Sequence, residues 1–340
     1  MQKRARLLLG LAISAFFLYF ALKGLNLQEV RYWLTQANYF WLIPSILIYF
    51  VAVWGRTWRW HYMLRPIKSI SLPRLFPTVC IGYMGNNIFP VRAGEVLRAY
   101  VLKRSEDISM SASIATIVVE RVFDGLVMLM FVFIALPFAP VPDSLRVYVI
   151  GASGIFFAAL LVFFVLAMQP DLARRAYALT VRRFLPQRVR EPADGFLDRF
   201  MEGLHFLRSS RDVVMIFVTS VFIWLAETGK YWFVMEAFAG QGGGFPVPFF
   251  VLMLMNGIVN LATTIPSAPG YVGTFDTPGI AVLSAYGVDK GLAFGYTVVL
   301  HAALWFPITI LGAWYFRREQ LAWGDVETAR AERAASLEAS

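Results

Sequence analysis

Two strongly apolar segments of this chain are interrupted near their middles by the same pattern, a proline followed four residues later by a glycine. One interruption occupies residues 90–94 and the other occupies residues 266–270. Inside a lipid bilayer, irregular backbone is tolerated only where protein or a water-filled cavity satisfies its N–H and C=O groups. A pair of broken segments at corresponding places in two halves of a chain is the best sequence indication of a transporter site. The sequence therefore predicts a fold organised around two breaks that enclose a polar site.

Composition places these segments in a membrane. Of the 340 residues, 58% are hydrophobic and 16% are charged, whereas soluble domains carry about 25% charged residues. The first apolar run follows basic residues as a signal peptide would, but no small-residue cleavage site follows it, so we interpret it as a retained span. The second run ends in an aromatic and basic stretch, residues 54–60, that is typical of a membrane interface. Long apolar runs thus predict six full transmembrane helices, at residues 7–22, 40–58, 109–136, 146–168, 212–237 and 290–316.

The charge distribution sets the predicted orientation. We interpret the net charge of +9 as cytoplasmic loops that face anionic lipid, not as nucleic-acid binding. Loops 137–145 and 238–248 contain no Lys or Arg. The positive-inside rule therefore places both termini and the other basic segments in the cytoplasm. Those basic segments are residues 56–74, 97–104, 169–211 and 317–318. The expected location is a bacterial-type inner membrane.

With this orientation the two broken segments cannot cross the membrane. Residues 75–104 must enter from the cytoplasm and return, whereas residues 248–286 must enter from outside and return. We therefore predict an all-α polytopic membrane protein with the six full spans and two oppositely oriented re-entrant hairpins in an inverted repeat. The alternative is two ordinary spans kinked at proline, which would leave basic loops or termini outside.

The predicted organisation is a single transmembrane domain over residues 1–318 and a polar cytoplasmic tail over residues 319–340. Residues 169–211 form a basic amphipathic loop on the inner leaflet, with a docking surface for a soluble partner as the alternative. One cysteine, Cys80, excludes an internal disulfide. The histidines are too far apart in sequence for a zinc motif. We predict no metal, no cofactor, no catalytic residue and no nucleic-acid partner.

Each broken segment is predicted to restart as a half-helix near the bilayer centre. The free N–H groups and the positive dipole end of such a helix attract anions. Arg92 lies at the first break and Arg98 follows about two turns later, so both are candidates to hold a phosphate-bearing headgroup. The alternative is that they snorkel to the cytoplasmic interface, which suits Arg98 better than the deeper Arg92.

Charged residues also occur within the predicted span 109–136, where they are costly and usually functional. Glu120 and Asp124 lie four residues apart on one helical face, and Arg121 is spaced to pair with Asp124. The alternative is a structural ion-pair network that fixes this span to the first hairpin, for example through Glu120 and Arg92.

Further polar residues lie in the second half and near the breaks. Glu227 and Lys230 are spaced to pair, and Glu227 and Asp276 are candidates to contact a proton or a headgroup amine. We interpret His301 as a hydrogen-bonded packing residue. Four asparagines are expected to cap exposed backbone, with ligand contact as the alternative: Asn86, Asn87, Asn256 and Asn260.

Three ordered motifs make the chain resemble a known family over nearly its whole length. They are Asn87…Pro90-x-Arg92-x-Gly94-Glu95-x-x-Arg98, Glu120-Arg121-x-x-Asp124 and Pro266-x-x-Pro269-Gly270-Tyr271-x-Gly273-x-x-Asp276. This combination resembles the lysylphosphatidylglycerol synthase transmembrane-region family, which consists of flippase-like integral membrane proteins. Two departures matter: residues 319–340 leave no room for the soluble aminoacyltransferase domain of some members, and the final motif position, often Glu in relatives, is Asp276.

The resemblance implies a membrane bundle that moves or presents lipid headgroups. The predicted substrate-binding residues are Asn87, Pro90, Arg92, Gly94, Glu95, Arg98, Glu120, Arg121, Asp124, Glu227, Lys230, Asn260, Pro266, Pro269, Gly270, Gly273 and Asp276. The expected function is translocation of an anionic phospholipid, glycolipid or polyprenyl-linked lipid. The alternatives are a membrane-embedded transferase and an accessory subunit that presents lipid to a lipid- or glycan-modifying enzyme. The expected partners are membrane lipids and such an enzyme, and the sequence is compatible with an oligomer.

Overall fold

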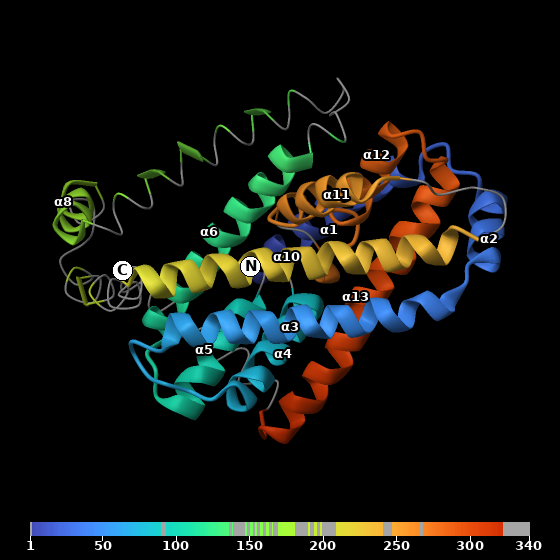
Figure 1. The fold of residues 1–340 in the computed structure, drawn as a ribbon. Helices are drawn as coiled ribbons and strands as arrows, with labels where there is room; N and C mark the ends of the chain where they lie inside the picture. Colours follow the sequence, from blue (N-terminus) through green and yellow to red (C-terminus); the bar gives the residue numbers. More distant parts are fainter. Residues whose placement is uncertain are drawn as a thin grey trace.

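The computed structural model describes residues 2–89, 93–135, 169–180, 209–240, 247–265 and 268–321, with isolated positions between 138 and 198 (Figure 1). This part of the chain is helical and contains no strand. The long helices are α1 (Gln2–Leu22), α3 (Leu42–Leu64), α6 (Met110–Ala135), α10 (Ser210–Phe238) and α13 (Lys290–Arg318). The short ones are α2 (Leu27–Gln36), α4 (Leu72–Ile88), α5 (Ala93–Glu106), α8 (Pro170–Thr180), α11 (Phe249–Ala262), α12 (Asp276–Ala285) and the 3-10 turns η1 (Tyr39–Trp41) and η4 (Pro269–Tyr271).

Three stretches are long and apolar enough to cross a bilayer: Tyr39–Leu64, Arg211–Phe238 and Lys290–Arg318. They correspond to three of the six predicted spans, and the predicted span 146–168 falls mostly outside the described residues. Helix α6 has 26 residues, roughly 39 Å at about 1.5 Å per residue, so it matches a bilayer in length. Its Glu120, Arg121 and Asp124 set it apart from the three apolar spans.

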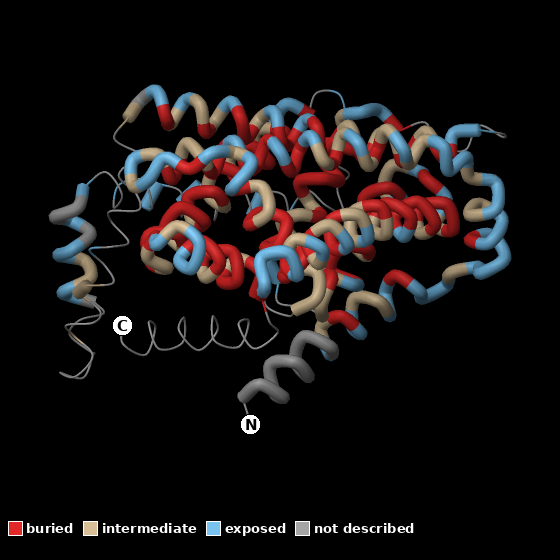
Figure 2. The backbone as a smooth tube through the Cα atoms, turned by 90° about the horizontal axis from the view of Figure 1, so that it is seen from below, coloured by how far each residue is buried: buried red, intermediate tan, exposed pale blue. Residues whose placement is uncertain are grey.

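Exposed and buried positions alternate along the long helices (Figure 2), and many of the exposed ones are large apolar residues whereas several charged ones are buried. In water, apolar stripes of this length would be an aggregation hazard, whereas lipid is their natural solvent. The charged residues buried between the helices are typical of membrane proteins with an internal polar site. The protein is therefore an integral membrane protein. The exposed stripes include Phe40, Ile43, Leu47, Val51, Trp54 and Trp58 around α3, and Val214, Val218, Phe222 and Leu225 on α10.

Helices α3 and α10 lie side by side and antiparallel at the centre of the molecule (Figure 1). At one end the Asn38 N–H donates to the Ala237 carbonyl oxygen over 2.7 Å. At the other end the Arg65 guanidinium lies 2.5 Å from the Asp212 carboxylate. Gly55 sits at the helix crossing, where an added Cβ would lie 3.0 Å from a side-chain carbon of Ile223. The small residue therefore lets the two long helices approach closely.

Each broken segment forms a pair of short helices that pack against each other. In the first pair, α4 and α5 have 17 and 14 residues, and in the second, α11 and α12 have 14 and 10. At about 1.5 Å per residue none of the four reaches the roughly 30 Å thickness of a hydrocarbon core. The first pair is especially close, because a Cβ on Gly94 would lie 1.8 Å from the carbonyl oxygen of Gly82.

The two halves of the chain, α3–α6 and α10–α13, use the same set of helix contacts. Helix α3 packs on α4 as α10 packs on α11, and α5 packs on α6 as α12 packs on α13. Between the halves, α4 packs on α13 as α11 packs on α6. The antiparallel α3–α10 pair lies at the centre of this pattern. Corresponding elements of the two halves are thus arranged in the same way around a shared core.

Candidate functional site

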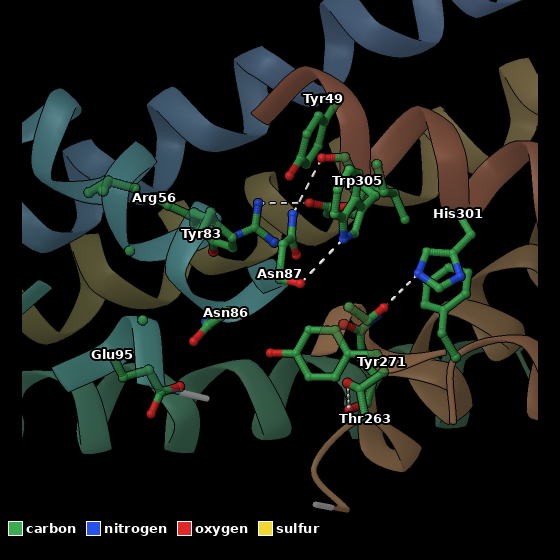
Figure 3. Close-up of a pocket in the computed structure, with 18 of the residues that line it drawn as sticks. Tyr49, Arg56, Tyr83, Asn86, Asn87, Glu95, Thr263, Tyr271, His301 and Trp305 are labelled. Carbon is green, nitrogen blue, oxygen red and sulfur yellow. Dashed lines mark hydrogen bonds and ion pairs between the residues drawn. The ribbon is translucent and has the colours of Figure 1, made fainter. Parts of the chain in front are cut away.

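A cavity of about 140 Å³ lies where the two broken segments approach each other (Figure 3). Its walls come from both hairpins and from α3, α6, α10 and α13. Gly94 lines it from the first hairpin and Gly270 from the second. The glycines that end the two interruptions therefore line one internal space.

The wall from the first hairpin combines amide and charged side chains. Asn86 and Asn87 end α4, and Glu95 and Arg98 lie on the first two turns of α5. Only a residue without a Cβ fits at Gly94, because the crossing with α4 leaves no space there. This close crossing places the start of α5 and the end of α4 at the edge of the cavity.

The wall from the second hairpin depends on an unusual backbone. Gly270 has φ +73°, in the left-handed region that glycine adopts readily. An added Cβ there would lie 2.8 Å from the indole nitrogen of Trp305. Thr263 and Tyr271 also line the cavity from this side. Gly270 is thus required both by its backbone conformation and by its contact with α13.

Helix α13 holds both breaks. The Trp305 indole N–H donates to the Asn87 carbonyl oxygen at 3.4 Å, and the Asn87 amide donates to the Thr309 hydroxyl at 2.8 Å. One turn earlier, His301 Nε2 lies 2.7 Å from the Gly270 carbonyl oxygen and Nδ1 lies 2.8 Å from Asp276 Oδ1. A single helix therefore contacts the end of α4 and the loop before α12.

Glu120 and Asp124 anchor a buried charge network behind the first hairpin. Glu120 contacts Arg98 at 3.0 Å, Arg59 at 3.5 Å and also Arg121. Asp124 contacts Arg59 at 2.6 Å and Arg121 at 3.4 Å, which confirms the predicted Arg121–Asp124 pair. The Trp224 indole N–H donates to Asp124 at 2.9 Å. The network therefore connects α3, α5, α6 and α10.

A second charged group lies on α3 and α10. Glu227 contacts the Arg56 guanidinium at 2.7 Å and also Lys230, which confirms the predicted i,i+3 pair. Arg56 lies over the Tyr83 ring at 5.5 Å, and Lys230 lies 4.8 Å from the centre of the Tyr49 ring. Aromatic faces attract cations electrostatically, so the two cations are held from several sides.

The cavity lining carries more cations than anions. Four of its side chains are basic and two are carboxylates, so the formal charge of this set is 4 − 2 = +2 with His301 neutral. Within the described residues, the Nε–H of Arg98 is buried and has no hydrogen-bond partner. A free buried donor beside a net positive lining favours an anionic ligand. The four cations are Arg56, Arg98, Arg121 and Lys230, and the carboxylates are Glu95 and Glu227.

The residues predicted from the sequence fall into three groups. Three lie outside the described residues: Pro90, Arg92 and Pro266. Five lie near the cavity without lining it: Glu120, Asp124, Pro269, Gly273 and Asp276. The remaining nine line it: Asn87, Gly94, Glu95, Arg98, Arg121, Glu227, Lys230, Asn260 and Gly270.

One sequence alternative and one sequence interpretation are wrong. Arg98 does not snorkel to an interface, because it is buried against Glu120 with its guanidinium 4.4 Å from the Trp60 ring centre. The basic residues at 54–60 are not an interfacial girdle, because Arg56 and Arg59 point inward and are buried. Their spacing carried the signal: Arg56 and Arg59 share one helical face, and the exposed Trp54 and Trp58 share another.

Several lining residues carried no recognisable sequence signal. His301 was interpreted as a hydrogen-bonded packing residue; its hydrogen bonds confirm the first part, and it also lines the cavity. The asparagines predicted to cap backbone bond both backbone and side chains: Asn260 donates to the Asn256 carbonyl oxygen at 2.8 Å, Asn87 to that of Trp305 at 3.4 Å, and Asn256 to the Thr228 hydroxyl at 3.1 Å. Only the tertiary fold gathers the aromatic lining, which comprises Tyr49, Tyr83, Trp224, Tyr231, Tyr271, Phe275 and Trp305.

Metal binding has no support in the part of the chain that the structure describes. It contains no group of three or more His, Cys, Asp or Glu side chains placed to hold a metal ion. The single histidine–carboxylate pair at the cavity, His301 and Asp276, is completed by a backbone carbonyl. The chemistry that this lining offers is ion pairing and hydrogen bonding.

Comparison with known proteins places the fold among membrane proteins. The family model of the lysylphosphatidylglycerol synthase TM region matches residues 7–312, which confirms the resemblance inferred from the three motifs. A UPF0104 membrane protein of Pyrococcus horikoshii is 22% identical over 334 residues, covering 92% of this chain and 96% of the relative. One from Methanothermobacter thermautotrophicus is 22% identical, covering 84% of this chain and 87% of the relative. The glycosyltransferase AglD of Haloferax volcanii is 25% identical over 339 residues, covering 91% of this chain but 54% of the relative.

Proposed function

The chain belongs to the lysylphosphatidylglycerol synthase transmembrane-region family, and we propose that it moves an anionic lipid headgroup between the leaflets of a membrane. The observation that carries this proposal is the cavity between the two breaks, with its four cations and two carboxylates. A charged headgroup cannot cross hydrocarbon unaided at a useful rate, because desolvation of a charge is costly. An internal site with ready-made donors lowers that cost while the acyl chains remain in lipid.

In this proposal the cationic side chains bind the phosphate of the headgroup. Arginine guanidinium groups suit this task, because their planar N–H pairs match phosphate oxygens. Arg98 offers a buried N–H without a partner, and Arg121 is the most accessible cation, with 38% of its side chain exposed. Arg92, at the first break, is proposed to join them. Glu95 and Glu227 hold the cations in place and give the site polar contacts for the rest of the headgroup.

We further propose that α4–α5 and α11–α12 are re-entrant hairpins of opposite orientation. Their lengths support this, because each helix is shorter than the hydrocarbon core. The matched helix contacts of the two halves and the antiparallel α3–α10 pair support an inverted repeat. The starts of α5 and α12 then lie inside the membrane, where their dipoles add to the positive potential of the cavity.

Cysteine labelling tests this topology. With Cys80 replaced, a single cysteine at Asp107, after α5, is expected to react only from the cytoplasm. A cysteine at Asp289, before α13, is expected to react only from outside. The measurement is labelling of intact cells with a membrane-impermeant maleimide, before and after lysis. If the cysteine at Asp289 is protected until lysis, the second hairpin and the inverted repeat are both wrong.

Lipid transport is tested by loss of the most accessible cavity cation. In liposomes with fluorescent phosphatidylglycerol in both leaflets, the wild-type protein should make the inner-leaflet dye accessible to an external quencher. Arg121→Gln is expected to slow this flux about tenfold, because one charge-assisted bond is worth roughly 1.5 kcal/mol. The fold should persist, since Glu120 and Asp124 keep contacts with Arg98 and Arg59.

Arg317→Gln provides the matched control, because Arg317 is an exposed basic residue in the last turn of α13. Its flux should equal that of the wild type. Equal flux for Arg121→Gln and wild type would remove Arg121 from the site. No flux from the wild-type protein would contradict the proposed function itself.

A second candidate function is a role in building lipid-linked glycans. It rests on one relative whose name is glycosyltransferase AglD, of which this chain matches about half the length (54%). In that case the cavity would hold a lipid headgroup for a glycosyl-transfer reaction instead of moving the headgroup across the membrane. Formation of a glycosylated lipid without leaflet exchange, in the same liposomes, would favour this alternative.

A further inference from the structure

His301 is placed between two hydrogen-bond acceptors at the second break. Its Nδ1 lies 2.8 Å from the Asp276 carboxylate and its Nε2 lies 2.7 Å from the Gly270 carbonyl oxygen. A neutral imidazole has one N–H and one lone pair, so it can satisfy only one of these acceptors. With Asp276 ionised, both bonds form only when the ring carries two protons and a positive charge. The geometry therefore describes the imidazolium form.

We propose that His301 is the proton-binding site that couples the second hairpin to the state of the cavity, an inference that rests on the proposed transport function. The bound proton joins Asp276, His301 and Gly270 into one chain of bonds. Loss of the proton forces the ring to give up one partner. One of the two bonds that join α13 to the second hairpin is then lost.

The released segment controls the contact between the two breaks. Asp276 also accepts the Gly273 N–H at 2.8 Å, so one carboxylate bonds both the loop and the histidine. Gly270 packs on Trp305, which in turn contacts the Asn87 carbonyl oxygen at the first break. A change at His301 is therefore transmitted directly to the place where the two hairpins meet.

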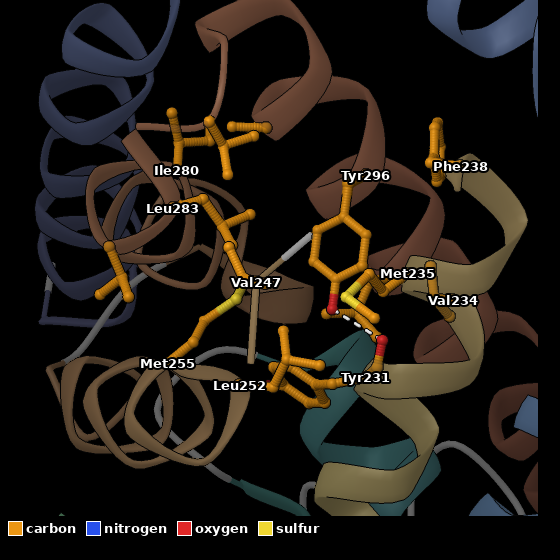
Figure 4. Close-up of a cluster of buried hydrophobic side chains, with 14 of the residues drawn as sticks. Tyr231, Val234, Met235, Phe238, Val247, Leu252, Met255, Ile280, Leu283 and Tyr296 are labelled. Atoms are coloured by element: carbon orange, nitrogen blue, oxygen red, sulfur yellow. Dashed lines mark hydrogen bonds between the residues drawn. The ribbon is translucent and has the colours of Figure 1, made fainter. Parts of the chain in front are cut away.

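The helices around this segment are fixed, so the movement is local. Helices α10, α11, α12 and α13 share a packed cluster of buried apolar side chains (Figure 4). Within it the Tyr296 hydroxyl donates to the Tyr231 carbonyl oxygen at 2.9 Å, which ties α13 to α10. Close-packed cores of this kind resist gradual deformation.

The first half of the molecule provides a comparison. There, an ion pair joins Arg98 on α5 to Glu120 on α6, and in the second half the corresponding helices α12 and α13 are joined by Asp276 and His301. Arginine stays charged at every physiological pH, whereas histidine titrates between about pH 5 and pH 8. The first hairpin is therefore held permanently, and only the second is held by a removable charge.

Other charged and titratable groups face His301 across the cavity. They come from every neighbouring wall: Arg56 and Tyr49 on α3, Tyr83 on α4, Glu95 and Arg98 on α5, Arg121 on α6, and Glu227, Lys230 and Tyr231 on α10, with Tyr271 beside Gly270. The closest ring is Phe275, with its centre 4.6 Å from that of His301. The acids and bases among them pair with one another, as do Glu227 with Arg56 and Glu95 with Arg121. Asp276 is the carboxylate that contacts His301 directly.

Nitrogen NMR of the full chain in lipid nanodiscs, with labelled histidine, tests the proton site without any transport assay. The His301 signals are identified by their loss in His301→Gln. We expect both ring nitrogens to be protonated at low pH and one proton to leave between about pH 5 and pH 8. A ring that keeps one protonation state throughout that range overturns the proposal, whether or not lipid moves.

Flux measured in liposomes at several pH values tests the coupling. Wild-type flux is expected to rise as the proton leaves, whereas His301→Gln flux should not depend on pH. His61→Gln is the control, because His61 binds the Ile70 carbonyl oxygen away from the cavity and should keep the wild-type profile. Asp276→Asn should move the inflection to lower pH, since the imidazolium loses its carboxylate, and it covers the case in which His301→Gln does not fold.

A wild-type pH profile in both His301→Gln and Asp276→Asn would overturn the coupling role. The absence of wild-type flux at every pH would contradict the transport function and the coupling with it. The NMR titration would then still decide whether His301 binds a removable proton.

Discussion

Replacing Glu120 by alanine is expected to cause one of the largest losses of stability of any single substitution in this protein. Glu120 is fully buried and contacts Arg59, Arg98 and Arg121. Arg59 is also fully buried and Arg98 is 4% exposed, so neither cation can turn to water when the carboxylate is removed. Breaking one buried ion pair costs about 3–5 kcal/mol, and here two buried cations are affected. The measurement is the thermal unfolding midpoint in detergent.

Glu106→Ala is the matched control. Glu106 pairs with Lys68 at 2.8 Å, but 47% of the lysine side chain is exposed. Exposed pairs contribute about 0–1 kcal/mol, so this variant should unfold close to the wild-type midpoint. If Glu120→Ala is no less stable than Glu106→Ala, the network does not hold the helices together.

Glu120→Gln separates a structural role from a functional one. The amide keeps the shape and can still accept hydrogen bonds from the arginines, but it has no charge. A variant that is stable yet inactive would mean that the charge at Glu120 serves transport. A variant that is stable and fully active would exclude Glu120 from the mechanism and leave Arg98, Arg121 and the second break as the site.

The network also changes what the pairing of Arg121 and Asp124 means. From the sequence alone, removal of both Arg121 and Asp124 should destabilise the protein less than removal of Arg121 alone, because no buried charge is left unpaired. In the structure Asp124 also binds Arg59 at 2.6 Å, and Arg59 is buried whereas Arg121 is partly exposed. Loss of Asp124 leaves the buried Arg59 without this carboxylate, so it should cost more stability than loss of the partly exposed Arg121. We expect Arg59, not Arg121, to be the arginine on which stability depends.

The sequence predicts the helices of this protein better than it predicts their contacts. Apolar runs and the two Pro-x-x-x-Gly motifs locate α4–α5 and α11–α12, because bilayer length and backbone satisfaction act locally along the chain. The network of Arg59 with Asp124 depends on residues that are 65 positions apart. No periodicity within one helix can reveal such a pair. Arg59 was misinterpreted because a basic residue near the end of a span can lie either at the membrane interface or between the helices.

Some residues of the candidate site can be predicted from the sequence, whereas others are recognised only from contacts between helices. Gly94 and Gly270 are readable from the sequence, because glycine in a broken apolar segment implies unusual backbone or close approach. The role of His301 cannot be predicted from the sequence, because it follows from contacts of α13 with Gly270 and Asp276 of the second hairpin. Isolated polar residues in apolar helices are therefore best treated as candidates until their cross-helix partners are known.

Gly94→Ala is expected to disrupt the first hairpin itself. The added Cβ would lie 1.8 Å from the Gly82 carbonyl oxygen and 2.5 Å from the Asn86 nitrogen, both of which are backbone atoms. A flexible side chain could move aside, but here α4 and α5 must separate along their whole contact. Overpacking usually costs about 1–3 kcal/mol, and a backbone clash of this depth should exceed that range. Separation would also pull Arg98, one turn later, away from Glu120.

Gly257→Ala, in the middle of α11, is the control for this substitution. The nearest atom to its added Cβ is a side-chain carbon of Val132 at 3.6 Å, which is ordinary contact. Alanine is favoured over glycine within a helix by about 0.5–1 kcal/mol, so this variant should be as stable as the wild type or slightly more stable. Gly94→Ala should instead yield little folded protein, with a much lower unfolding midpoint in whatever is recovered. Equal midpoints for the two alanine variants would mean that α4 and α5 do not cross at Gly94, and the cavity that depends on this crossing would have to be built differently.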